Sequence, residues 1–471
     1  MKWWQISLLL CCFGFLKDFR PAEPFLSHYL TGPWKNFTKS EVNQYVYPIN
    51  TYSYLACTIF VLLLTDLVRY KPVIILCGLS GTACFVTLVL GKTLFLMQIV
   101  EFLYGLFLSA EVAYYTYIYA KVDKKHYQEV TGHTKGASLL GRFTSAVFGQ
   151  ITVSFYLLDY HQLTMITVGA FAISVIFALF LPSVEQSIYF HSSKNNAKSN
   201  PTLEPIDASV NSINSNTNQS NFNFNLEKRI PQPDIEKHDN LKQKIRNACK
   251  LLWTDFRSAY TNVHVIKWSA WWAFATCGYL QVASYMQLIW IDIAQDGEKI
   301  YNGAVDAVYK IIGAIAVFIV SKAPLNWPLL GEAVLSVFSI LEGVLVIFSS
   351  ITSTLWVSYI CFVAFEVIYH TIITIANFEV AKYINNDSFG LIFGINTFLT
   401  LVLQSVLTII VVDGPLKLDI RKQFFIYGGY FLILGILFMI MGILTIAMSY
   451  RKGERFRFFT TVEDNKRKPE V

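Results

Sequence analysis

Residues 109–122 read SAEVAYYTYIYAKV, and this stretch gives the first indication of the fold. The stretch is apolar enough on both sides to lie in a membrane, yet it carries an acid, Glu111. At about 100° per helical residue, Tyr114 and Tyr115 lie within about 60° of Glu111. An ionised carboxylate in hydrocarbon costs several kcal/mol, so it normally faces a polar cavity or a partner. One helix face therefore offers a carboxylate between aromatic rings, which suits an organic cation; the alternative is an acid that pins two helices together.

The composition of the whole chain indicates a membrane protein. Of its 471 residues, 54% are hydrophobic and 15% are charged, and the mean hydropathy is +0.44. A soluble chain of this length would need more charge to cover its surface. Long apolar runs alternate with short polar joints, which predicts an all-α membrane protein rather than a barrel. The first run, Trp3 to Phe15, lacks a convincing signal-peptide cleavage site, and we interpret it as a retained first helix.

Other function classes lack their sequence signals. The net charge of +6 does not indicate nucleic-acid binding, because the lysines and arginines lie in joints and tails. The eight cysteines are scattered without a disulfide framework or a metal-binding spacing. The sequence contains no phosphate loop, nucleophile elbow or His/Cys cluster. We therefore expect no enzyme activity, no cofactor and no metal.

The apolar runs form two sets of six around one long polar segment. We expect residues 1–182 to form an N-terminal six-helix half, residues 261–450 a C-terminal six-helix half, and residues 451–471 a cytoplasmic tail. Residues 183–260 are rich in Asn and Ser. They cannot bury enough apolar surface to fold alone, which predicts a mostly disordered cytoplasmic loop. About twelve spans in two parallel halves around a central cavity are typical of major-facilitator carriers, which work by alternating access.

Lysine and arginine also predict the orientation. They concentrate in the joints after the even-numbered spans and in the tail, which places both termini in the cytoplasm. The first joint contains the glycosylation sequon NFT at residues 36–38, which places Asn36 outside. The two signals agree, although the joint at residues 417–422 is basic on the outer side.

The first two spans contain polar features that suit a carrier. Charges and prolines interrupt the first span between residues 17 and 24. A helix that unwinds beside a cavity explains them, so Glu23 is a second candidate substrate contact; alternatively the helix ends near Arg20. At the end of the second span, Asp66 and Arg69 match a recurrent gating element of major-facilitator transporters, which can clamp two helices by charge-assisted hydrogen bonds.

The second half carries charged pairs inside its spans. Asp306 and Lys310 are four residues apart, so they can pair within one helix. This pair is either self-neutralised and structural or places an acid on the substrate path. Glu366 and His370 have the same spacing; they could couple protons to transport, or they could be structural. A polar stripe in the seventh span should face protein or cavity, and it consists of Gln281, Ser284 and Tyr285.

Taken together, several strings resemble the vitamin carriers that move reduced folate or thiamine. They are RPAEPFLSHYL (20–30), TYSYL (51–55), LTDLVRYKPVIIL (64–76), EFLYG (101–105), AEVAYYTYIY (110–119), IYNGAV (300–305) and FGINTF (393–398). They cover the membrane spans in order and leave out the central loop and the tail. The resemblance implies a twelve-span major-facilitator fold in the plasma membrane, surrounded by lipid. It also implies a monomeric transport unit with a small vitamin bound between the halves.

Within this family, the substrate's charge should be reflected in the cavity. The reduced-folate type has cations at the positions matching Glu111, Glu366 and Gln404, which suit a dianionic substrate. This chain has replaced all three. At Glu111 it resembles the thiamine type, whose acid faces the cationic vitamin. The further contacts that the resemblance implies are Glu23, Asp306, Tyr47 and Tyr114.

The chain also departs from the thiamine type. Thiamine carriers tend to have Trp where Asn50 stands, Asn where Ser284 stands and Tyr where Arg142 stands. Arg142 could neutralise Glu111. We expect a secondary carrier for a water-soluble vitamin, thiamine above others, with Glu111 as the main cation partner. The alternatives are a reduced-folate or organic-anion carrier that uses Arg142, and a vitamin receptor that does not transport.

Overall fold

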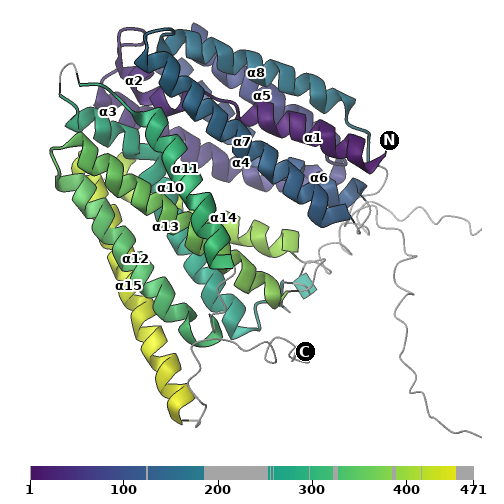
Figure 1. Cartoon of the computed structure of the whole chain (residues 1–471), viewed down its shortest axis with the longest axis vertical. Helices are drawn as coiled ribbons and strands as arrows, with labels where there is room; N and C mark the ends of the chain where they lie inside the picture. The colour runs from purple at the N-terminus through teal and green to yellow at the C-terminus, as the bar shows by residue number, and fades with distance from the viewer. Residues whose placement is uncertain are drawn as a thin grey trace, which may run out of the picture.

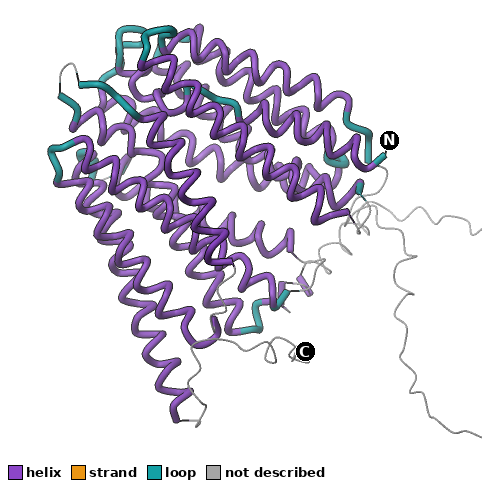
Figure 2. The backbone as a smooth tube through the Cα atoms, viewed as in Figure 1, coloured by secondary structure: helices purple, strands orange, loops and turns teal. Residues whose placement is uncertain are grey.

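The computed structural model describes most of the membrane-embedded chain. The described residues are 2–122, 126–184, 253–254, 256–257, 259–295, 298–321, 327–384, 389–414 and 416–451. Within these ranges every regular element is a helix (Figure 2). Nearly all of the expected central loop and of the expected tail lies outside them.

The helices form two bundles, one from each half of the chain (Figure 1). The N-terminal bundle consists of α1 (Trp3–Asp18), η1 (Glu23–Phe25), α2 (Leu26–Thr31), α3 (Lys39–Glu41), η2 (Val42–Val46), α4 (Tyr47–Leu67), α5 (Lys71–Leu90), α6 (Leu94–Lys121), α7 (Tyr127–Ser154) and α8 (Tyr160–Phe180). The C-terminal bundle consists of α10 (Val263–Ile293), α11 (Asn302–Ser321), α12 (Trp327–Ile351), α13 (Leu355–Lys382), α14 (Phe389–Thr408), η6 (Ile409–Asp413) and α15 (Ile420–Arg451). Among the described helices, 8 are long and apolar enough to cross a membrane. With α4, α7, α10 and the interrupted first segment they give the predicted total of 12.

The first segment is interrupted where prolines and charges predict it. Helix α1 ends at Asp18, and the chain resumes as a short turn at Glu23. Pro21 and Pro24 cannot donate backbone hydrogen bonds, so a continuous α-helix is unfavourable here. On the facing helix, Gly141 lets α7 approach closely, because a Cβ at this position would lie 2.5 Å from the carbonyl oxygen of Phe15. The close approach brings α7 next to the charged end of α1.

Helix α7 differs from its predicted bounds. The sequence predicts a span near Leu139 to Leu158, whereas the helix runs from Tyr127 to Ser154. Its first turns contain Glu129, His133 and Lys135, which hydropathy does not assign to a membrane. Hydropathy marks the part of a helix that lies in hydrocarbon, and α7 is longer than that part.

The two bundles are joined by hydrogen bonds at one end, which we call the closed end. There Gln287 of α10 accepts the backbone N–H of Ser27 at 3.0 Å and donates to the carbonyl of Glu23 at 2.9 Å. Asn302 of α11 donates to the carbonyl of Pro24 at 2.9 Å. Gln150 of α7 donates to the carbonyl of Ile300 at 3.0 Å. Away from this end the bundles diverge (Figure 1).

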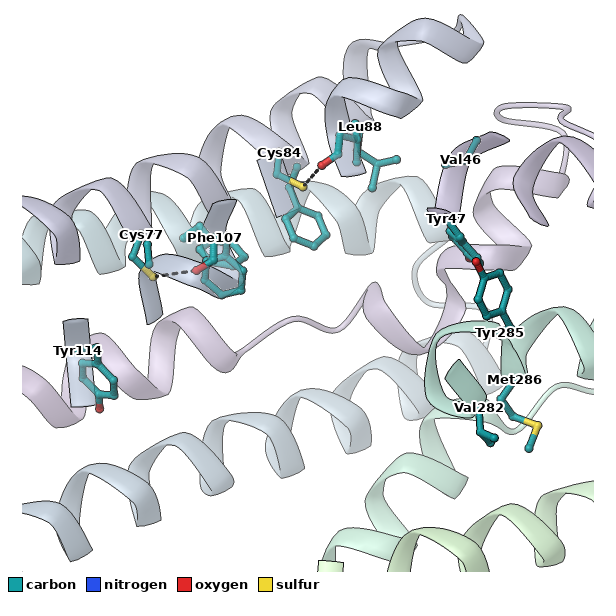
Figure 3. Close-up of a cluster of buried hydrophobic side chains, with 14 of the residues drawn as sticks. Val46, Tyr47, Cys77, Cys84, Leu88, Phe107, Tyr114, Val282, Tyr285 and Met286 are labelled. Carbon is teal, nitrogen blue, oxygen red and sulfur yellow. Dashed lines mark hydrogen bonds between the residues drawn. The ribbon is translucent and has the colours of Figure 1, made fainter. Parts of the chain in front are cut away.

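Two tyrosines pack across the same junction. The rings of Tyr47 in α4 and Tyr285 in α10 meet edge to face, with centroids 5.8 Å apart. Figure 3 shows the two rings pointing toward each other from their helices. The hydroxyl of Tyr47 also lies 2.5 Å from that of Ser27. The closed end is therefore packed as well as hydrogen-bonded.

The basic joint at residues 417–422 has a structural use at the closed end. Arg421 donates through Nε to Asp292 at 2.6 Å and through Nη1 to the carbonyl of Thr352 at 2.9 Å. It thereby ties together the ends of α10, α12 and α15. Lys39 of the other bundle also reaches Asp292, at 3.4 Å. The pairing of Arg421 explains why this joint is basic, although lysine and arginine are expected to concentrate in the cytoplasmic joints.

Candidate functional site

Charged side chains of α1, α6 and α7 meet inside the N-terminal bundle, together with two from the break after α1. The positive members are Lys17, Arg20 and Arg142, and the negative ones are Asp18, Glu23 and Glu111. Three positive and three negative charges cancel. We call this set the N-cluster.

Asp18 is the fixed centre of the N-cluster. Its side chain is 0% exposed, and it accepts hydrogen bonds from Lys17 at 2.9 Å and from Arg142 Nε at 3.2 Å. Arg20 Nη2 adds a longer contact at 3.4 Å. A carboxylate can remain ionised when fully buried only if cations and donors compensate for its lost hydration. Three cations do so here.

Glu111 holds a single close cation. Lys17 Nζ lies 2.5 Å from Glu111 Oε1, whereas Arg142 Nη2 lies 3.8 Å away. The hydroxyl of Tyr115 is 3.5 Å from the same oxygen. The Glu111 side chain keeps 16% of its surface exposed. Arg142, which from the sequence could neutralise Glu111, lies near it, but the closer partner is Lys17.

The predicted combination of a carboxylate and aromatic rings is present. Lys17 Nζ lies 5.3 Å from the ring centroid of Tyr114 and 5.9 Å from that of Tyr115. The Tyr114 ring is fully buried, and its hydroxyl donates to the carbonyl of Leu10 in α1. An ammonium group thus already sits beside Glu111 and within cation–π distance of two rings.

Glu23 is held in place at the break after α1. Arg20 Nη1 donates to Glu23 Oε1 at 2.8 Å and to the hydroxyl of Tyr104 at 2.8 Å. Tyr104 donates in turn to Glu23 Oε1 at 2.6 Å. The Glu23 side chain is 39% exposed, so this oriented carboxylate remains accessible. Tyr104 was not predicted, although it lies in the EFLYG string.

Both charged pairs predicted in the C-terminal bundle form. Asp306 pairs with Lys310 within α11. In α13, His370 Nε2 lies 3.2 Å from Glu366 Oε2. Tyr279 of α10, which the sequence did not predict as a partner, donates to Glu366 Oε2 at 3.3 Å.

Both bundles carry charged groups inside their spans: the N-cluster in the first bundle, and the pairs of α11 and α13 in the second. Asp306, Lys310 and Glu366 together carry one net negative charge when His370 is neutral. Because the N-cluster is neutral, the combined set also carries one net negative charge. Such a set is complementary to a monocation.

Other predicted site residues lie nearer the closed end. Tyr47 is buried against Tyr285 there. Asn50, one turn further along α4, is partly buried, and its side-chain oxygen has no hydrogen-bond partner among the described residues. Ser284 is partly buried in α10, between the fully buried Gln281 and Tyr285.

The predicted gate and sequon are described only in part. The side chain of Asp66 lies outside the described part of the structure. Arg69 is exposed and adopts a φ of 66°, followed by Tyr70 at 65°, so the chain turns sharply after α4. Asn36 is exposed with a φ of 59°, in a loop at the closed end.

The cysteines near the site serve packing. Cys77 donates its thiol to the carbonyl of Phe107, at an Sγ–O distance of 3.7 Å (Figure 3). Cys84 does the same to the carbonyl of Val100 at 3.4 Å. Among the described residues, no group of three or more His, Cys, Asp or Glu side chains is placed to hold a metal ion.

Comparison with known proteins adds a family likeness. A sequence profile described as "Reduced folate carrier" matches residues 1–426. Thiamine transporter 1 of Homo sapiens is 38% identical over 438 residues, which cover 91% of this chain and 87% of that protein. Thiamine transporter 2 of Homo sapiens is 37% identical over 447 residues, covering 91% and 88%. Folate transporter 1 of Caenorhabditis elegans is 35% identical over 432 residues, covering 92% and 90%.

Solved structures resemble the fold at low sequence identity. A POT family transporter aligns with a TM-score of 0.61 at 11% identity, covering 93% of this chain and 96% of that one. The nucleoside transporter NupG, as its D323A mutant, aligns with a TM-score of 0.58 at 13% identity, covering 93% and 99%. Both alignments support a major-facilitator arrangement of the two bundles.

Proposed function

The chain belongs to the reduced folate carrier family and is a multi-pass vitamin carrier with a major-facilitator fold. We propose that its substrate is thiamine or a closely related cationic vitamin. The observation that carries the proposal is the Glu111 carboxylate. It is partly exposed at membrane depth, and it already binds an ammonium group beside two tyrosine rings.

The charge of the groups inside the spans supports a cationic substrate. Thiamine carries a permanent positive charge on its thiazolium ring, and the combined set of charges is one negative charge in excess. At an effective dielectric constant of about 20, opposite charges about 4 Å apart attract by about 4 kcal/mol. Glu23 and Asp306 are the supporting acids in this proposal, and the rings of Tyr114 and Tyr47 the aromatic contacts.

The vitamin would replace Lys17 at Glu111. Lys17 keeps a second carboxylate, Asp18, at 2.9 Å when Glu111 turns to another cation. Arg142 is also closer to Asp18 than to Glu111. Glu111 can therefore exchange partners without leaving a buried cation unpaired, which would cost several kcal/mol.

The transport cycle would follow alternating access. We place both termini in the cytoplasm, the closed end with Asn36 outside the cell, and the carrier in the plasma membrane as a monomer. The bundles diverge away from the closed end, so this conformation is open toward the cytoplasm. Asp66 and Arg69 would form the cytoplasmic gate, and Glu366 with His370 would couple transport to protons.

Uptake into cells without endogenous vitamin carriers tests the substrate. Labelled thiamine should accumulate, and unlabelled thiamine should compete with it at far lower concentration than reduced folate. Accumulation of labelled folate with no thiamine uptake would overturn the proposal. Purified carrier in proteoliposomes separates transport from the receptor alternative, because a receptor would bind thiamine without accumulating it.

A folate or organic-anion carrier is the second candidate, and Arg142 is the observation that favours it. Its side chain is 39% exposed, and it binds Asp18 through Nε while Nη2 lies 3.8 Å from Glu111. Arg142→Gln should abolish uptake of an anionic vitamin but preserve uptake of a cationic one. Glu129→Gln, which changes an exposed acid on the same helix, is the control.

A further inference from the structure

We infer that Glu342 of α12 is a second proton-binding site of the carrier, which holds its proton in this conformation and exchanges it with the Glu366–His370 pair during transport. The inference rests on the proposed carrier function and extends it to proton coupling. It assigns a role to a buried acid that the substrate site does not use.

Glu342 is buried without a partner. Its side chain is 0% exposed, and neither carboxyl oxygen has a hydrogen-bond partner among the described residues. Glu379 of α13 is also fully buried, but it binds Lys382 at 2.5 Å and His264 at 3.2 Å. Glu332, on the same helix as Glu342, binds Lys267 at 2.5 Å. The absence of any such cation sets Glu342 apart from these two acids.

The helices packed around Glu342 offer it no charge. On α15, the positions that contact this part of α12 include Gly428, Leu432 and Gly435. Tyr430 of α15 donates to the carbonyl of Phe274 in α10, and the buried hydroxyl of Tyr427 has no hydrogen-bond partner among the described residues. On α10 itself, Trp271 donates its indole N–H to Ser339, one turn before Glu342. On α13, the hydroxyl of Tyr369 donates to Thr276 at 3.0 Å and not to Glu342.

This environment fixes the protonation state. An ionised carboxylate with no partner in hydrocarbon costs several kcal/mol more than its neutral form. Glu342 is therefore a neutral acid in this conformation. It can lose its proton only when a rearrangement brings a donor, a cation or water to it, and this requirement links its protonation to the transport cycle.

A row of side chains on α10 and α13 leads from Tyr369 to the partly exposed His370. Tyr369 stacks on Tyr279, with ring centroids 3.8 Å apart and an interplanar angle of 4°. Tyr279 donates to Glu366, which pairs with His370, and the His370 side chain is 44% exposed. The hydroxyl of Tyr369 donates to Thr276 at 3.0 Å, so in this conformation the row does not reach Glu342.

The proposed step moves one proton and changes no other bond. When a rearrangement brings the hydroxyl of Tyr369 from Thr276 to Glu342, the O–H bond of Glu342 breaks and the proton passes through the tyrosine hydroxyls to the Glu366 carboxylate. His370 then accepts it and releases it to water. Glu342 is left as a carboxylate, and it regains a proton along the same side chains after alternating access has exposed His370 to the other side of the membrane.

Proteoliposome transport separates this role from a structural one. Glu342→Gln keeps the shape of the neutral acid but cannot release a proton. We expect thiamine counterflow at equal pH to stay within about twofold of wild type, and the stimulation of uptake by a pH gradient to disappear. Glu129→Gln, which changes an exposed acid, should keep the stimulation. Full stimulation in Glu342→Gln, or loss of counterflow in a folded Glu342→Gln, would overturn the inference.

An infrared measurement tests the proton directly and does not depend on the substrate. Protonated carboxyl groups have a carbonyl band that carboxylates and amides lack. This band should be present in the wild-type carrier at neutral pH and weaker by one group in Glu342→Gln. An unchanged band overturns the inference even if thiamine proves to be the substrate. Failure of wild-type thiamine counterflow would instead overturn the proposed substrate and leave the infrared result to decide on Glu342.

Discussion

Asp18 and Glu111 are two acids of one cluster with different surroundings. Asp18 is fully buried and contacts three cations, whereas Glu111 is partly exposed and has one close cation, which Asp18 shares. The burial and the number of partners assign Asp18 to stability and Glu111 to the substrate. The two roles can be separated by substitution.

The first prediction concerns Asp18→Asn. The change leaves Lys17 and Arg142 with only Glu111 as a counter-charge, and an unpaired buried charge costs about 3–5 kcal/mol. Surface biotinylation should therefore show a large loss of protein at the plasma membrane. Normal surface protein with selective loss of thiamine uptake would instead make Asp18 a substrate residue.

The second prediction concerns Arg142→Gln. Removing this cation, which lies 3.8 Å from Glu111, should strengthen the attraction of Glu111 for a cationic vitamin and lower the KM for thiamine, by about fivefold for each kcal/mol gained. Concentration-dependent uptake measures the effect. An increased KM for thiamine would show that the guanidinium contacts the substrate rather than competing with it.

Charged pairs could be predicted from the sequence where both partners lie on one helix. Asp306 with Lys310 and Glu366 with His370 are each four residues apart, and that spacing alone places the side chains together. The close partner of Glu111 was not predictable in this way, because Lys17 is separated from it by 94 residues. A lysine inside an apolar run does indicate that a facing acid exists, but not which one.

At the scale of elements, α12 and α15 are held together by glycines. A Cβ at Gly428 would lie 2.5 Å from Ile347 Cγ1 and 2.8 Å from the carbonyl oxygen of Gly343. At the neighbouring Gly429, a Cβ would have no atom within 4 Å. The two glycines thus form a matched pair on one helix.

The third prediction uses this pair. Gly428→Ala should destabilise the carrier by about 1–3 kcal/mol, because α12 and α15 must move apart. Gly429→Ala should be neutral or slightly stabilising, because alanine favours the helix. Thermal unfolding of the purified variants in one detergent compares them. Equal unfolding temperatures would contradict the close packing of the two helices.

Helix existence was more predictable than helix extent. The break after α1 follows from prolines and charges that a continuous helix cannot accommodate. The start of α7 at Tyr127 was missed, because a helix that extends beyond the hydrocarbon is polar there. Hydropathy predicts which part of a helix lies in hydrocarbon, but it does not predict how far the backbone hydrogen bonds of the helix extend beyond that part.

At the scale of the whole molecule, Gln287 joins the two bundles through two hydrogen bonds. The fourth prediction is that Gln287→Ala weakens the closed end. Losing two bonds worth about 0.5–1.5 kcal/mol each should shift the population toward an outward-open state by about 1–3 kcal/mol. Labelling of Asn50→Cys by a membrane-impermeant thiol reagent from outside should then become faster than in the single variant. An unchanged labelling rate would contradict the role of Gln287 in closure.

The fifth prediction tests the orientation through Asn36. Asn36→Asp should remove the glycan, seen as loss of the mass shift on glycosidase treatment. Aspartate tolerates the left-handed φ of 59° at this position. Thr38→Ala is a poorer choice, because Thr38 also caps α3 by accepting the backbone N–H of Glu41. If the wild-type protein carries no glycan in cells that glycosylate, the prediction that the closed end lies outside the cell loses its support.

The division into two halves was predictable from the sequence, but their relative position was not. Two sets of apolar runs around a polar segment are sufficient for the first. The closed end depends on contacts such as Gln287 with Glu23 and Gln150 with Ile300, which join residues 264 and 150 positions apart. Glutamine and asparagine have no sequence pattern that identifies such partners.

The role of Glu111 as the binding partner of the vitamin's cation is tested most directly by thiamine uptake in Glu111→Gln at matched surface expression. Glutamine keeps the shape of the side chain and removes the charge that we assign to the vitamin's cation. We expect the amount of surface protein to stay near the wild-type level while saturable thiamine uptake is lost. Unchanged thiamine uptake, or loss of the protein from the surface, would contradict it.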